Sequence, residues 1–247
     1  MTLLETNGVR KAFGNVVAVD GIDFAIDSGD VVGIIGPNGA GKTTFVNLLT
    51  GTLPLDNGSI RFNGTDISST STHKRAKRGL VRSFQIPQVC FELSVLKNVR
   101  IAILSEKEQN NALFTSLERD DASKQEAITL LDQFGLADKA NQPVEEITHG
   151  DRKILDVCMS VAIQPQLVVL DEPTSGVASG QKRAVMDEIM DLMRQKNLAV
   201  IFISHDMELV ADYSDRVVAM SGGQKLTEGS PDTVLEADTV RKQIRGD

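Results

Sequence analysis

The stretch that decides the fold reads Val31-Val-Gly-Ile-Ile-Gly-Pro-Asn-Gly-Ala-Gly-Lys-Thr-Thr44. Its apolar first part, Val31–Ile35, is typical of a buried strand, and the residues that follow it, 45–49, are compatible with a helix. Between them, residues 36–43 match every fixed position of the phosphate-loop pattern G-x-x-x-x-G-K-[ST]. The stretch therefore predicts a strand, a phosphate-binding loop and a helix in succession, as in an α/β fold.

Each residue type in this loop suits the binding of a triphosphate. Glycines let backbone N–H groups close around phosphate oxygens, and the start of the following helix adds the positive end of its dipole. Lys42 is expected to neutralise the β- and γ-phosphates, Thr43 to bind Mg²⁺ through its hydroxyl, and Thr44 to lie near the α-phosphate. The alternative is a glycine-rich turn of purely structural use, which average composition makes uncommon. The predicted nucleotide-binding residues are Gly36, Pro37, Asn38, Gly39, Ala40, Gly41, Lys42, Thr43 and Thr44.

Two acidic residues follow a second apolar run, Leu167–Leu170. They stand at the carboxyl end of a predicted buried strand, where open α/β sheets bind their ligands. Asp171 suits Mg²⁺, and Glu172 could polarise the attacking water as a general base. The alternative is that both acids cap the next helix. The phosphate loop in the same chain favours the catalytic interpretation.

A histidine ends the next predicted strand, which covers Ala199–Ile203. His205 is expected at the same sheet edge as Glu172, where an imidazole can contact a γ-phosphate. A helix cap made by Ser204, His205 and Asp206 would give the same sequence pattern. Clustering at one edge favours a catalytic role for His205.

Composition restricts the class of protein. The chain has 247 residues and a net charge of −8, which disfavours a nucleic-acid partner because such binding rests on phosphate neutralisation. No apolar run approaches the roughly 20 residues that cross a bilayer, and the first residues do not resemble an export signal, so we expect a cytoplasmic protein. Cys90 and Cys158 lack metal-ligand spacing and are expected to be buried thiols in a reducing compartment.

The pattern of strands and helices changes along the chain. Residues 2–35 and 57–63 predict short strands separated by turn residues, among them Val16–Val19, Ile22–Ile26, Val31–Ile35 and Ser59–Phe62. From Ser94 onward the apolar period becomes helical. The runs 167–170 and 199–203, with a helix-like segment between them, predict a β-α-β unit. One compact domain with two lobes is therefore expected.

Taken in chain order, the motifs are Gly36–Thr44, Gln85, Ile147–Asp151, Leu170–Pro173 and Ser204–Asp206. This series, which covers nearly the whole chain, resembles that of ABC-transporter ATP-binding subunits. The context Arg78–Gln85 is similar to that of importers for branched-chain amino acids (LivG-type) and for amides or urea. The resemblance implies a P-loop NTPase with a RecA-like core, an antiparallel β lobe and an α-helical subdomain. It places the core at about 1–85 and 165–247 and the helical subdomain at about 86–164 of a single 1–247 domain.

The same resemblance implies cofactors, partners and location. Two such subunits, identical or not, would enclose two Mg·ATP beneath a pair of transmembrane permease subunits, at the cytoplasmic face of the cell membrane. Phe13 would stack on adenine, as an aromatic ring can with any base; packing inside the β lobe is the alternative. Gln85 would bind Mg²⁺, sense the attacking water and act in catalysis.

The family signature Leu-Ser-Gly-Gly-Gln is altered in this chain to Ile147-Thr-His-Gly-Asp151. Thr148 and Gly150 retain its hydroxyl and second glycine at a predicted helix start, which could bind the γ-phosphate held by the partner subunit. An ordinary Thr cap is the alternative. His149 and Asp151 depart from the pattern, as does Ala178, which replaces the usual Asp of the subunit-coupling loop. A second match to the signature core, Ser221–Gln224, follows the acid pair and is interpreted as a hairpin turn.

The sequence therefore predicts the ATP-binding and ATP-hydrolysing subunit of an ABC importer. One alternative is a nucleotide-gated scaffold with little turnover, because of the altered signature and Ala178. A second is the ATPase of a lipopolysaccharide-type exporter, which is similar in length and motif order. An ABC ATPase of chromosomes or ribosomes is disfavoured by the net charge.

Overall fold

The computed structural model describes residues 1–83, 89–106 and 120–245. Short 3-10 turns lie at Ala137–Lys139, Val144–Glu146 and Ser179–Gln181, and a π-helical turn at Arg241–Arg245 ends the described chain. The strands are β1 (Thr2–Phe13), β2 (Val16–Asp27), β3 (Val31–Ile35), β4 (Asn57–Phe62), β5 (Thr65–Asp66), β6 (Leu80–Ser83), β7 (Leu167–Asp171), β8 (Ala199–Ile203), β9 (Arg216–Ser221) and β10 (Gln224–Gly229). The helices are α1 (Lys42–Thr50), α2 (Thr72–Ala76), α3 (Val95–Glu106), α5 (Asp121–Gln133), α6 (His149–Ala162), α7 (Lys182–Gln195), α8 (Met207–Tyr213), α9 (Pro231–Glu236) and α10 (Asp238–Val240).

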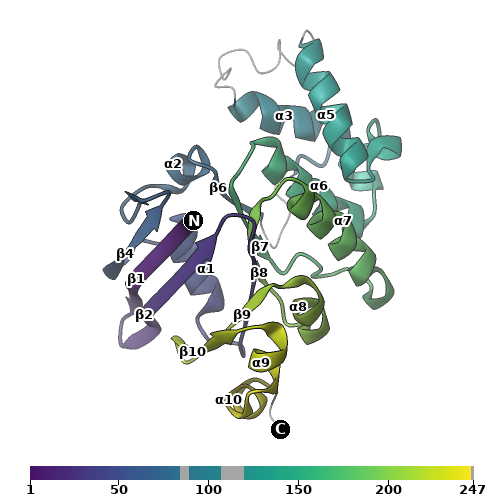
Figure 1. The fold of residues 1–247 in the computed structure, drawn as a ribbon. Helices are drawn as coiled ribbons and strands as arrows, with labels where there is room; N and C mark the ends of the chain where they lie inside the picture. Colours follow the sequence, from purple (N-terminus) through teal and green to yellow (C-terminus); the bar gives the residue numbers. More distant parts are fainter. Residues whose placement is uncertain (84–88, 107–119, 246–247) are drawn as a thin grey trace.

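Within the described residues the strands form two sheets. The larger has the order β10-β9-β3-β8-β7-β6, with β6, β7, β8, β3 and β9 parallel and β10 antiparallel to β9. The smaller is antiparallel and has the order β2-β1-β4-β5. In Figure 1 the small sheet stands on one side of the molecule, and α3, α5, α6 and α7 lie on the other. The predicted β-α-β unit is confirmed, since β7 and β8 are parallel neighbours.

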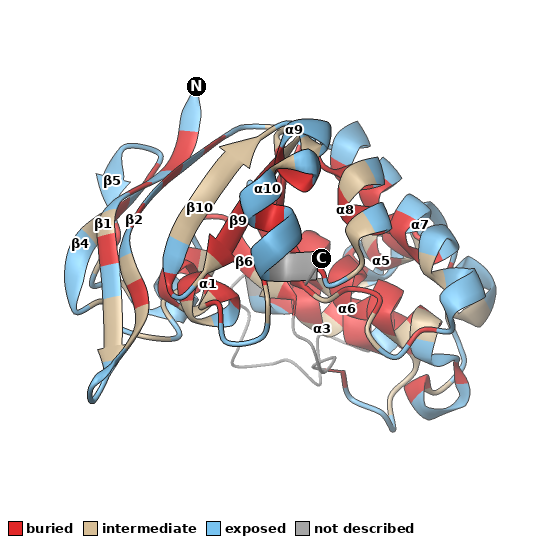
Figure 2. Cartoon of the chain, turned by 90° about the horizontal axis from the view of Figure 1, so that it is seen from below, coloured by how far each residue is buried: buried red, intermediate tan, exposed pale blue. Residues whose placement is uncertain are grey.

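The central strands are buried on both faces, which explains their continuous apolar sequences. Successive side chains of a strand point to opposite faces. Val32 and Ile34 belong to a core that also contains Phe45 and Leu48 of α1 and residues of the small sheet, so α1 packs between the two sheets (Figure 2). The side chains of the alternate positions, such as Val31, pack in a second core with helices α3, α5, α6, α7 and α8.

Two sequence predictions are corrected by the structure. The expected break between Val16–Val19 and Ile22–Ile26 does not occur, because Gly21, at φ +67°, is accommodated as an irregularity inside the continuous strand β2. Cys158 is buried as expected, but Cys90 is exposed.

The predicted hairpin at 221–224 is confirmed: Gly222 and Gly223 both have positive φ and join antiparallel β9 and β10. No helix in the described parts of the chain has the length and apolarity needed to span a membrane.

Candidate functional site

The phosphate loop leaves the carboxyl end of β3 and turns tightly into α1. Gly36 and Gly41 have φ of +157° and +95°, which favour glycine. A Cβ atom on Gly41 would lie 2.1 Å from the carbonyl oxygen of Ala18, so the loop packs directly against backbone there. No side chain of the described residues caps the start of α1. Its first N–H groups are therefore free to bind an anion.

The Lys42 side chain is folded over this loop. Its Nζ donates hydrogen bonds to the carbonyl oxygens of Gly36, at 2.7 Å, and Pro37, at 3.0 Å. Burial lowers the pKa of Lys42, while the nearby carboxylates of Glu172 and Asp171 act in the opposite direction and raise it. A buried cation is thus held beside an uncapped helix start, in a position to meet phosphate charge.

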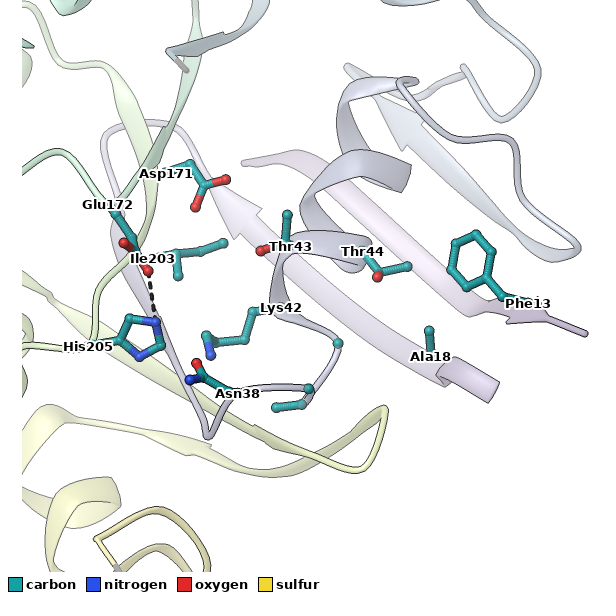
Figure 3. A pocket seen from close by; sticks show the side chains of 13 residues that line it. Phe13, Ala18, Asn38, Lys42, Thr43, Thr44, Asp171, Glu172, Ile203 and His205 are labelled. Atoms are coloured by element: carbon teal, nitrogen blue, oxygen red, sulfur yellow. Dashed lines mark ion pairs between the residues drawn. The ribbon is translucent and has the colours of Figure 1, made fainter. Parts of the chain in front are cut away.

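The phosphate loop and the acid pair line the same cavity, which has a volume of about 390 Å³ (Figure 3). Strands from distant parts of the sequence bring these residues together, because β3 lies next to β8 and β8 next to β7 in the sheet. The lining residues are Phe13, Ala18, Asn38, Gly39, Ala40, Gly41, Lys42, Thr43, Thr44, Asp171, Glu172, Ile203 and His205. Gly36 and Pro37 are not among the lining residues, and their carbonyl oxygens accept the hydrogen bonds from Lys42.

The Glu172 and His205 side chains contact each other at this sheet edge. The His205 Nε2 lies 2.8 Å from Oε1 of Glu172, and Figure 3 shows the two side chains pointing toward each other. The backbone of Glu172 has φ +50°, an uncommon conformation for a non-glycine residue that is enriched at functional sites. The helix-cap alternative holds for Asp206, which accepts from the Leu209 N–H, and leaves the His205 ring free to contact Glu172.

Two basic side chains that the sequence reasoning did not identify lie beside the acid pair. Arg82 on β6 forms a buried ion pair with Asp171 through Nη2, at 2.5 Å, and also donates a hydrogen bond to Asn47 on α1. Lys153 on α6 is buried as well: burial lowers its pKa, and the charges of Asp156, Glu172 and Asp171 raise it. Neither residue gives a local signal in the sequence, because each contact depends on which strands and helices are neighbours.

Phe13 lies at the end of β1 and contributes its ring to the cavity. The side chain is half exposed, at 50%, so the alternative of a ring packed inside the β lobe is wrong. The Lys11 Nζ lies 5.7 Å from the ring centroid, within the range of a cation–π contact. An exposed ring at one end of a phosphate cavity is placed as a base-stacking residue requires.

The comparisons with known proteins agree with this site. A family model described as ABC transporter matches residues 19–175. The chain belongs to this family. It is 32% identical to a probable branched-chain amino acid transport ATP-binding protein LivG of Methanocaldococcus jannaschii, over 93% of this chain and 90% of that one. It is 31% identical to the high-affinity branched-chain amino acid transport ATP-binding protein BraF of Pseudomonas aeruginosa, over 99% and 98%.

Solved structures give the same result for this ABC transporter chain. A crystal structure of the ADP conformation of an ATP-binding cassette of an ABC transporter matches it with a TM-score of 0.89 and 30% identity, covering 100% of both chains. A nucleotide-free ATP-binding cassette matches with a TM-score of 0.84 and 30% identity, covering 97% of both. The predicted P-loop NTPase fold, with its RecA-like core, β lobe and helices, and the predicted ATPase class are confirmed.

The altered signature of this ABC ATPase lies outside the cavity formed by its own phosphate loop. Thr148 caps α6 in a capping box: its Oγ1 accepts from the Asp151 N–H at 3.1 Å, and Asp151 accepts from the Thr148 N–H. Lys139 pairs with Asp151 at 2.7 Å, which balances the negative charge that Asp151 brings to the altered signature. The His149 ring contacts the Ser175 carbonyl at 3.1 Å. The roles of Thr148 and Gly150 toward a second chain stay a prediction, and Gln85 lies outside the described residues.

Proposed function

We propose that this chain is the ATP-binding and ATP-hydrolysing subunit of an ABC importer for branched-chain or other amino acids or amides. The supporting observation is that the phosphate loop and the acid pair line one cavity of about 390 Å³. The similarity to transport ATP-binding proteins for branched-chain amino acids, over nearly the full chain, supports the solute class.

The residues of the cavity divide into those that hold ATP and those that act on it. The loop N–H groups and Lys42 bind the phosphates, and Phe13 stacks on the adenine. Thr43 and Asp171 supply a hydroxyl and a carboxylate, the hard oxygen donors that Mg²⁺ prefers, and both line the cavity, so the residues present fit this ion. Gln85 is proposed as a further ligand. When bound, Mg²⁺ neutralises the charge that develops on the phosphates.

Glu172 is proposed as the general base. Its carboxylate lies in the cavity, where it can accept a hydrogen bond from the attacking water and draw the proton away from it. His205, paired with Glu172 at 2.8 Å, orients that carboxylate and contacts the γ-phosphate.

The partners are proposed from the family. A second ATP-binding subunit, the same chain or another, would place its Thr148 and Gly150 against the γ-phosphate held here, and transmembrane permease subunits would bind the helical subdomain at about 86–164. The remainder, about 1–85 and 165–247, would form the nucleotide-binding core. The complex would stand at the cytoplasmic face of the cell membrane.

The test is the variant Glu172→Gln. It should bind Mg·ATP with nearly the affinity of the wild-type chain and release almost no phosphate in a steady-state assay with the permease present. Glu208→Gln is the matched control, since Glu208 on α8 is exposed and outside the cavity. Unchanged turnover of Glu172→Gln would remove Glu172 as the base. Little turnover of the wild-type complex itself would favour the scaffold alternative.

The solute class needs a separate measurement. Cells that lack this chain should take up labelled leucine, isoleucine or valine more slowly than cells that carry it. Uptake that is unchanged for all three would contradict the branched-chain part of the proposal, leave the other amino acids and amides as the solute class, and leave the ATPase assignment intact.

A further inference from the structure

The last residues of β1, which end at Phe13, are held by the carboxylate of Asp56, a residue in the connection that leads into β4. The last paired residues of β1 and β4 are Arg10 and Asn57, so the segment 11–13 extends beyond β4. On its other side this segment forms the tip of the β1–β2 hairpin, where Phe13 faces Val16. A strand end paired on one side only is free to move unless a side chain restrains it.

Asp56, which directly precedes β4, supplies that restraint at three points. Its Oδ2 accepts a hydrogen bond from the Ala12 N–H at 2.7 Å, and its Oδ1 accepts one from the Lys11 Nζ at 2.6 Å. Its own N–H donates to the Arg10 carbonyl oxygen at 3.1 Å. The carboxylate thus occupies the place that a β4 residue would take in the sheet, immediately before the aromatic ring.

The same carboxylate also fixes the cation that lies beside the ring. The Lys11 side chain is only 12% exposed, and its Nζ lies both at Asp56 and 5.7 Å from the centroid of Phe13. The hydrogen bonds from Lys11 and Ala12 lower the pKa of Asp56, so the carboxylate is charged at neutral pH. One side chain therefore restrains both the backbone and the cation that position Phe13.

We propose that Asp56 is a positioning residue for nucleotide recognition: through Ala12 and Lys11 it holds the Phe13 ring ready to receive adenine. This inference rests on the proposed role of Phe13 in the nucleotide site. A ring that is ordered before the ligand arrives avoids the loss of conformational entropy on binding. Asp56 would then affect the affinity for adenosine-containing ligands and leave the phosphate contacts unchanged.

The experiment compares two ligands that differ by adenosine, ADP and inorganic pyrophosphate, titrated into the full chain by calorimetry. Phe13→Ala should weaken ADP binding roughly tenfold or more, the order expected for one stacked base. Asp56→Ala should weaken ADP binding about fivefold, because ADP would then have to order the Phe13 residue as it binds, which costs conformational entropy. Asp56→Asn, which keeps an acceptor for the Ala12 N–H but loses the charge, should fall between Asp56→Ala and the wild-type chain. Pyrophosphate binding should be the same in all.

A matched control is available on the neighbouring strand β2. The Asp23 Oδ1 accepts a hydrogen bond from the Gly8 N–H of β1 at 2.6 Å, at a position that precedes the segment 11–13 next to Phe13. Asp23→Ala should therefore bind ADP like the wild-type chain. An equal loss in Asp23→Ala, or an equal loss of ADP and pyrophosphate affinity in Asp56→Ala, would make Asp56 a general support of the lobe and overturn the proposal.

The failure of this inference can be told apart from the failure of the proposed function. Weakened ADP binding by Phe13→Ala with unchanged binding by Asp56→Ala would overturn the role of Asp56 alone. Unchanged binding by Phe13→Ala would remove the ring from the adenine site, and the role of Asp56 with it. Absence of ADP binding by the wild-type chain would refute the proposed function itself.

Discussion

The Arg75 side chain links the C-terminal end of α1 to residues 67–70, and replacing it should destabilise the protein strongly. The side chain is only 1% exposed, yet all five of its N–H donors bind backbone carbonyl oxygens. Nη1 donates to Leu48 and Leu49, in the last turn of α1, at 2.7 and 2.6 Å. The other two donor groups bind the carbonyls of Thr70, Ile67 and Ser68, at 2.9, 2.7 and 3.1 Å.

The magnitude follows from two opposing effects. Five charge-assisted hydrogen bonds, at about 1.5 kcal/mol each, contribute about 7 kcal/mol to the free energy of unfolding. Burial lowers the pKa of Arg75 to about 10, and this corresponds to a cost of about 3 kcal/mol for keeping the charge inside. Arg75→Met should therefore lower the free energy of unfolding by about 4 kcal/mol, comparable to truncating one partner of a buried ion pair.

The assay is urea unfolding followed by circular dichroism. With a slope of about 2–3 kcal/mol/M, the midpoint should fall by roughly 1.3–2 M. Arg10→Met is the control, since Arg10 forms an exposed ion pair with Asp20 and should cost less than about 0.5 kcal/mol. A midpoint for Arg75→Met that corresponds to less than about 1 kcal/mol would refute the reasoning, because the five carbonyls would then have found equivalent partners without the guanidinium.

Three further outcomes are expected. Lys42→Ala should abolish ATP binding in calorimetry, because no other side chain of the loop neutralises the phosphates; retained affinity would argue against the phosphate site. Arg82→Met leaves Asp171 buried without its ion-pair partner and should cost about 3 kcal/mol, measured as a fall in Tm of roughly 6–12 °C; an unchanged Tm would mean that Asp171 is solvated. For Asp151, burial raises the pKa, but the hydrogen bonds from Lys139 and Thr148 together outweigh it, so the folded pKa lies below the unfolded value. The stabilisation by the Asp151 carboxylate is therefore complete above the unfolded pKa of about 4 and is lost as the pH falls through the folded pKa. At pH 7, Asp151→Asn should lower the free energy of unfolding by about 1 kcal/mol. The urea midpoints of the wild-type chain and Asp151→Asn, measured from pH 7 to pH 3, should converge in acid. A difference that stays constant with pH would contradict a lowered pKa of Asp151 in the folded protein.

Much of the parallel core could be predicted from the sequence. The strands 31–35 and 199–203 were predicted with the bounds that the structure gives, and β7 extends one residue further than predicted, to Asp171. These strands are buried on both faces, so their sequences are continuously apolar and easily recognised. The turn at Gly222 was also predictable, because a type I′ two-residue hairpin needs positive φ at both central positions, which two consecutive glycines adopt readily.

The side-chain contacts around the site were harder to predict from the sequence. The pairing of Glu172 with His205 was anticipated only as a shared sheet edge, and the ion pair of Arg82 with Asp171 was not anticipated at all. Asp56 likewise stands 45 residues from Lys11 and gave no local signal. A charged residue has the same sequence pattern on a solvent-exposed face as in a buried pair, so its partner stays unidentified until the strand order is known.

The sequence by itself determined the phosphate loop, the strands that flank it and the acids at the end of β7, because each depends on backbone freedom and burial encoded within a few neighbouring residues. The tertiary structure alone decided that β3 lies between β8 and β9, and with it which side chains share the cavity and which charges are paired. Strand order is set by the packing of whole layers, and that packing brings together residues whose separation in the chain carries no local signal.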